Sequence, residues 1–201
     1  MAAESKNIKE IYLLISPYMS FLLSSAGKLT YHVKLLNSIS NASKREGVYG
    51  FIVLDGLSFS SIKAQEKALV EHAKKMFGQN NLKFLRQDEL STKFFYDESI
   101  EKRLIEREKI VVTGRGTYTL RGVLQSVSCF IKAYNIPSKN AFINLPESID
   151  GGRPEIDKKI LSGIPDLIQI EKKTPQIGLD DLTRWRDKRI HLLKKMGFSF
   201  G

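Results

Sequence analysis

Two β-branched runs on either side of a Gly-Arg-Gly triplet restrict the fold more than any other feature of this sequence. Residues 109–113 (KIVVT) and 117–120 (TYTL) are rich in the β-branched and aromatic residues that favour extended backbone. Arg115 lies between them with a glycine on each side. Because glycine adopts positive φ at little steric cost, paired glycines are typical of a tight turn. The segment therefore predicts a β-hairpin over residues 109–121, with Arg115 at its tip.

Three helices and a short strand are predicted directly before this hairpin. Ser60 is a good N-cap for the first helix, and Asp97 is a good N-cap for the third. Apolar residues at helical spacing give each of these two helices one inward face. In order along the chain, the predicted elements are the helix 60–77, the strand 82–85, the helix 87–95 and the helix 98–108.

This order of elements over residues 60–122 resembles the winged helix-turn-helix superfamily. The resemblance implies an α+β, mainly helical fold, in which a winged-helix module with a β-hairpin wing is flanked by further helices. It also implies a DNA-binding regulator, or a replication or partition factor, that reads duplex DNA with helix 98–108 and wing 109–121. The chain would then divide into an N-terminal segment 1–59, a winged-helix domain 60–136 and a C-terminal helical extension 137–201.

Basic side chains on the third helix, the hairpin and the C-terminal segment are the candidate nucleic-acid contacts. A major groove accepts one helix that exposes a basic face, and a cation on a narrow hairpin tip reaches phosphates or the minor groove. Four glutamates dilute the charge of helix 98–108, so a solvated helix or a protein contact is the alternative. Residues 180–196 predict a basic amphipathic helix that clamps phosphates, lies on a membrane or docks on its own core. The candidates are Lys102, Arg103, Arg107, Lys109, Arg115, Arg121, Arg186 and Arg189.

The N-terminal part of the chain is apolar and predicts a buried helix over residues 7–24, kinked at Pro17. Its most apolar stretch, residues 11–23, is too short to span a bilayer and has no clear signal-peptide cleavage site. The following helix, 28–42, and strand, 48–54, fit two interpretations: a second, degenerate winged helix, or a helix and strand of a shared core. Because the first helix is apolar nearly all round, it must be buried within the monomer or against a second copy. We therefore expect a homodimer.

The charge balance favours an anionic partner. The formal net charge is +10, and the excess lies mainly in residues 60–122, with 13 basic and 9 acidic side chains, and residues 151–201, with 11 and 7. We expect nucleic acid as the partner, with duplex DNA ahead of RNA, and rank a membrane surface lower.

The single cysteine, Cys129, excludes an intrachain disulfide and a cysteine zinc site, and fits an intracellular protein, cytoplasmic or nuclear. The three histidines show no ligand spacing, so no metal or other cofactor is expected.

Two alternatives to a regulator stay open. One is a structural or assembly protein, viral or plasmid-encoded, that coats nucleic acid or an anionic membrane. The other is a metal-dependent nuclease, because GIPDLIQIEKK (residues 163–173) resembles the PD-(D/E)xK signature. In that case Asp166, Glu171 and Lys173 would bind a divalent metal and activate water. The spacing leaves little room for the hairpin that normally separates the carboxylates, so we expect no enzymatic activity.

Overall fold

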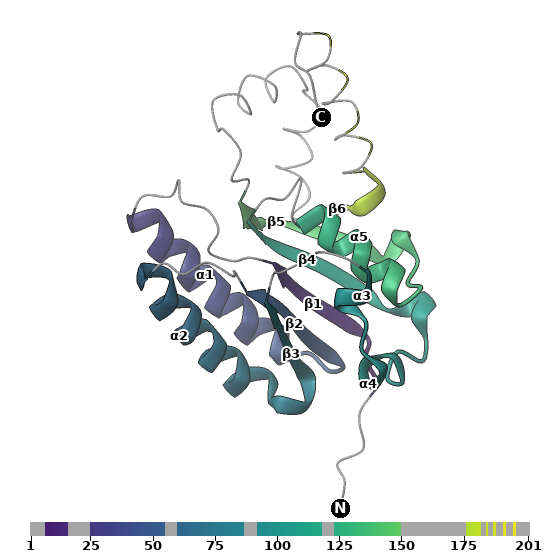
Figure 1. The fold of residues 1–201 in the computed structure, drawn as a ribbon, viewed down its shortest axis with the longest axis horizontal. Helices are drawn as coiled ribbons and strands as arrows, with labels where there is room; N and C mark the ends of the chain where they lie inside the picture. Colours follow the sequence, from purple (N-terminus) through teal and green to yellow (C-terminus); the bar gives the residue numbers. More distant parts are fainter. Residues whose placement is uncertain are drawn as a thin grey trace, which may run out of the picture.

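A sheet of six strands organises the described part of the chain, and its strand order reverses beside the first strand. In the computed structural model, the described residues are 7–15, 25–54, 60–86, 92–117, 123–149 and 176–181, with the single residues 184, 187, 191 and 195. The spatial order is β3-β2-β1-β4-β5-β6; β1 to β5 are parallel, and β6 pairs antiparallel with β5 (Figure 1). The strands are β1 (Glu10–Ile15), β2 (Val48–Leu54), β3 (Leu82–Arg86), β4 (Val111–Thr117), β5 (Ala141–Ile149) and β6 (Gln176–Gly178).

Helices cover both faces of the sheet. The helices α1 (Ser25–Ser43) and α2 (Ser60–Phe77) lie side by side on one face, and α3 (Thr92–Phe95) and α5 (Leu124–Ala133) lie on the other (Figure 1). The short helix α4 (Glu98–Glu101) follows α3. Three 3₁₀ turns are also described, η1 (Gln79–Asn81), η2 (Arg107–Lys109) and η4 (Ser138–Asn140), and residues 179–181 after β6 are helical.

The core has two layers, and β1 contributes to both. Alternate side chains point to opposite faces of a strand, so Leu13 packs under α3 and α5, whereas Tyr12 and Leu14 pack under α1 and α2. All three are fully buried. A central parallel strand with helices on both faces needs apolar side chains at every position, which explains the unbroken run YLLI.

The fold is therefore α/β, and the predicted mainly helical winged-helix fold is wrong. Residues 111–117 form a single strand, β4, which pairs with β1 on one side and β5 on the other. The glycines that were predicted to form a hairpin turn, Gly114 and Gly116, instead allow α5 and β1 to pack closely against β4. A Cβ on Gly114 would lie 2.3 Å from Val127 Cγ2, and a Cβ on Gly116 would lie 1.9 Å from the carbonyl oxygen of Ile15. Larger residues would force α5 and β1 away from β4.

Two predicted helices are also corrected. The helix predicted over 98–108 ends at Glu101, and the chain then turns through η2 into β4. The described part of the helix predicted over 7–24 is the strand β1. A short apolar run does not distinguish a buried strand from a buried helix by its periodicity, and pairing on both edges favours the strand. In the N-terminal region, α1 and β2 form part of the shared core, and no second winged helix is present among residues 25–54.

Other elements agree with the predictions. The helix at 60–77, the strand at 48–54 and a helix within 123–135 are confirmed. The three predicted segments contribute to one sheet, since β1 and β2 come from the first, β3 and β4 from the second, and β5 and β6 from the third. Among the described helices, none combines the length and hydropathy that crossing a bilayer requires.

Candidate functional site

The reversal of strand order between β1 and β4 marks the candidate site. From β1 the chain continues to α1 on one face of the sheet, and from β4 it continues to α5 on the other face. In open α/β sheets, ligands bind outside the carboxyl ends of the strands at such a reversal. We call this region the switch-point site and define it by Ile15, Arg115, Gly116, Val123 and Ser126.

The carboxyl end of β4 has an irregular backbone. Gly116 has a φ of 133°, and it approaches the carbonyl group of Ile15 too closely for any side chain. The ladder with β5 is also interrupted, because Gly114 pairs with Ile143 but Gly116 pairs with Ser148. Residues 144–147 thus lie opposite a single residue of β4. Bulges of this kind bend a strand and are common beside active sites.

Arg115 lies in the interior, away from the surface position that a hairpin tip would give it. Only 3% of the residue is exposed, and its guanidinium carbon lies 3.8 Å from the centroid of the Tyr12 ring. The Tyr12 hydroxyl donates a hydrogen bond of 3.0 Å to Ser38 Oγ of α1. A guanidinium stays protonated in proteins, and stacking on an aromatic ring stabilises it by about 2 kcal/mol where both groups are desolvated. The protein therefore holds a fixed positive charge under α1, one strand position from Gly116.

The described start of α5 packs against β4, because a Cβ on Gly114 would lie 3.1 Å from Val123 Cγ1. Val123, directly before α5, already has helical φ and ψ of −68° and −46°, and its side chain caps no amide. Ser126, in the first turn, is fully buried, and its Oγ has no hydrogen-bond partner among the described residues. Helical side chains tilt toward the helix N-terminus, so this hydroxyl projects toward the beginning of α5. A buried serine hydroxyl without a partner favours a ligand group that accepts a hydrogen bond.

Most of the described candidate cations lie far from this edge, near the amino ends of the strands. Each of three lysines or arginines there is paired with a glutamate from its own part of the chain. The pairs are Lys102 with Glu98 at 2.7 Å, Lys109 with Glu106 at 2.9 Å, and Arg107 with Glu101. Their charges are therefore largely neutralised within the protein.

The Arg103 side chain is held by contacts within the protein. It donates hydrogen bonds to the Asn80 carbonyl oxygen at 2.6 Å and to Asn81 Oδ1 at 2.7 Å, and it lies over the Tyr49 ring. Burial lowers the pKa of Arg103 from its ordinary value, and the nearby Tyr49 opposes this shift. These contacts join the segment after α4 to η1.

The remaining predicted site residues fall outside the described residues. They are Arg121, Arg186 and Arg189 for nucleic acid and Asp166, Glu171 and Lys173 for the nuclease alternative. Of the five candidate nucleic-acid contacts that lie among the described residues, only Arg115 belongs to the switch-point site. Sequence reasoning missed Ser126, for which a buried serine in the first turn of an apolar helix was the only available signal.

No group of three or more histidine, cysteine, aspartate or glutamate side chains suited to a metal ion occurs in the described part of the chain. Comparison of the sequence with protein-family models and with curated proteins gives no match.

Proposed function

We propose that the protein binds a small phosphorylated molecule at the switch-point site. The observation that carries this proposal is the reversal of strand order at β1 and β4, with the start of α5 directly beside it. A phosphate group accepts several hydrogen bonds at once, and helix N-termini at such reversals are a common place for it in α/β proteins.

The chemistry of the flanking residues supports a phosphate rather than a neutral ligand. A buried hydroxyl without a partner costs about 1–3 kcal/mol, and a phosphate oxygen accepting from Ser126 would remove that cost. The guanidinium of Arg115 lies on the α1 face of the sheet, over Tyr12, and its positive charge is weakly screened inside the protein. The ladder between β4 and β5 is interrupted at Arg115.

Replacing Ser126 by alanine tests the proposal, because it separates stability from binding. Ser126→Ala removes an unsatisfied hydroxyl, so the free energy of unfolding should stay unchanged or rise by about 1 kcal/mol. Binding of phosphorylated ligands should weaken about tenfold, which corresponds to about 1.4 kcal/mol. Calorimetric titration with inorganic phosphate, AMP and ATP, with adenosine as the unphosphorylated control, measures the affinity.

Ser38→Ala is the matched control. Ser38 is also a buried serine, but it accepts a hydrogen bond from Tyr12 under α1. Its removal should lower the free energy of unfolding by about 1 kcal/mol and leave ligand affinity unchanged. Absence of binding by all three phosphorylated compounds, or equal affinities of Ser126→Ala and wild type, would show the proposal to be wrong.

A second candidate function is nucleic-acid binding, supported by the net charge and by three exposed lysines. Lys44 follows α1, and Lys74 and Lys75 lie in the last turn of α2, so all three occupy neighbouring helix ends. None of them takes part in an ion pair between described residues. We call these three residues the lysine edge; it would contact phosphates in place of helix 98–108.

A further inference from the structure

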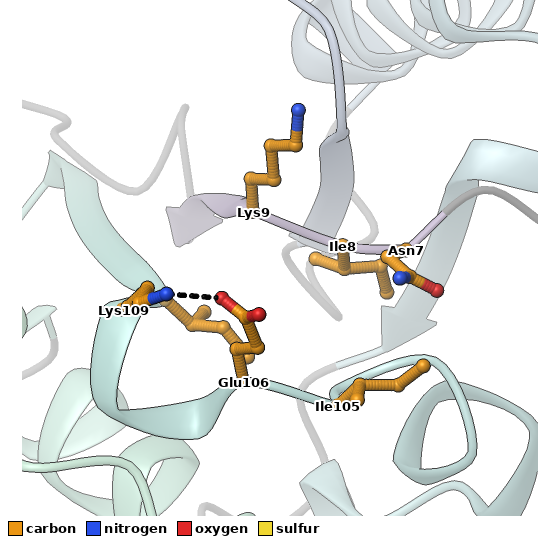
Figure 2. A pocket seen from close by; sticks show the side chains of 7 residues that line it. Asn7, Ile8, Lys9, Ile105, Glu106 and Lys109 are labelled. Carbon is orange, nitrogen blue, oxygen red and sulfur yellow. Dashed lines mark ion pairs between the residues drawn. The ribbon is translucent and has the colours of Figure 1, made fainter.

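A cavity of about 330 Å³ opens at the amino ends of β1 and β4, the edge opposite the switch-point site. Ile8 and Ile110 are buried and line it, while Ile105, Glu106 and Lys109 border it from the segment between α4 and β4 (Figure 2). We call this region the Ile105 face. A cavity of this size and largely apolar lining accommodates an aliphatic side chain from another molecule.

Ile105 is held outward beside this cavity. It is 64% exposed, more than any other large apolar side chain among the described residues. The segment that carries it is fixed by backbone hydrogen bonds, from Ile8 N to Arg103 O at 3.1 Å and from Lys109 N to Glu106 O at 2.8 Å. Ile105 is thus an aliphatic projection in a fixed position, next to a cavity that it does not fill.

We infer that the Ile105 face is the interface of a two-fold symmetric homodimer. A two-fold axis brings the same patch of two copies together, so a projection beside a cavity is complementary to itself. Each Ile105 would enter the cavity of the partner copy and cover the apolar lining. The exposed Val111 at the start of β4 would be covered at the same time.

Charge at this face favours a second copy over an anionic partner. Glu106 and Lys109 form an ion pair at the cavity, and Lys9 pairs with Glu46 nearby. These charges cancel, so two copies can approach here despite a net charge of +10 on each chain. Across the two-fold axis, Glu106 of one copy would also face Lys109 of the other. The inference is independent of the proposed ligand site, which lies at the opposite edge.

Sedimentation velocity on the full chain tests the dimer. Wild type should associate at micromolar concentration, and Ile105→Asp should raise the dissociation constant more than tenfold by placing a charge at the centre of the interface. Val33→Asp is the matched control, because Val33 is exposed on α1, away from this face, and the dimer should persist. Thermal unfolding of each variant checks that its fold is retained.

A charge reversal adds a second measurement. Glu106→Lys alone and Lys109→Glu alone should each weaken the dimer, and the double variant should regain most of the lost affinity, because opposite charges again meet across the axis. A wild-type chain that stays monomeric at about 100 μM, or a dimer with the same affinity in the Ile105→Asp variant, would overturn the inference.

Discussion

Asp97 shows how one side chain joins two elements and makes stability depend on pH. Its Oδ1 accepts hydrogen bonds from Ser99 N at 2.8 Å and Ser99 Oγ at 2.6 Å, which caps α4, and its Oδ2 accepts from Lys83 Nζ on β3. The hydrogen bond from Lys83, followed by that from Ser99, lowers the pKa of Asp97 to about 2. The folded protein therefore binds this proton less readily than the unfolded chain does.

The first prediction concerns this carboxylate. Since its pKa is lower in the folded state, Asp97 stabilises the fold above about pH 4, and this contribution disappears as the pH falls from about 4 toward 2. Asp97→Asn keeps a good N-cap but loses the charge, so stability at neutral pH should fall and its decrease between pH 4 and 2 should become shallower. Urea unfolding at several pH values measures this. Glu106→Gln, at an exposed ion pair, should leave the decrease nearly as it is in wild type.

At the residue scale, the sequence shows which side chains are charged but not what they pair with. The i,i+4 spacing of Glu98 and Lys102 is visible in the sequence, and the structure contains that pair. The partners of Arg103 and Arg115 come from η1 and β1, far away along the chain. The positions of Arg103 and Arg115 depend on the sheet topology. Because the predicted fold was wrong, the predicted surface positions of both arginines were wrong as well.

At the scale of elements, β4 gives the clearest test of the fold. Gly116 has positive φ and lies against the Ile15 carbonyl, so Gly116→Ala should lower the free energy of unfolding by more than about 3 kcal/mol or prevent folding. Gly78→Ala is the control, because Gly78 also has positive φ, at 73°, but no atom lies within 4 Å of the added Cβ. It should cost only about 1 kcal/mol. Equal small costs at both positions, measured by urea unfolding, would contradict a buried β4 and favour an exposed turn.

The elements that were predicted correctly carry their signals locally. Ser60 at the start of α2 and the apolar stripes of α2 and α5 depend only on nearby residues. The elements that were predicted wrongly, β1 and β4, are central parallel strands whose partners lie far away in sequence. Such strands lack polar alternation, and the close approach of α5 and β1 to β4 requires glycines that resemble a turn signal.

At the scale of the whole molecule, the carboxyl ends and the amino ends of the parallel strands carry different kinds of groups. The carboxyl ends of β1 and β4 carry Gly116 and lie beside the buried Ser126 of α5. The amino edge combines ion pairs, the Ile105 face and the lysine edge. The proposed ligand site and the proposed dimer interface therefore lie at opposite ends of the strands, and mutations can test them separately.

The last prediction concerns the net charge of +10 and decides whether nucleic-acid binding is a function of this protein. Each lysine that contacts a phosphate steepens the fall of log affinity with log salt by about 0.9, because bound counterions are released. Replacing Lys44, Lys74 and Lys75 together with glutamine should therefore weaken duplex binding at low salt and flatten this slope by up to about 3. Replacing Lys102 and Lys109, which are already paired with glutamates, should change the slope little. If the lysine-edge variant keeps the wild-type slope, or wild type binds no duplex at low salt, the lysine edge does not contact nucleic acid, and the lysines serve to stabilise the C-terminal ends of α1 and α2.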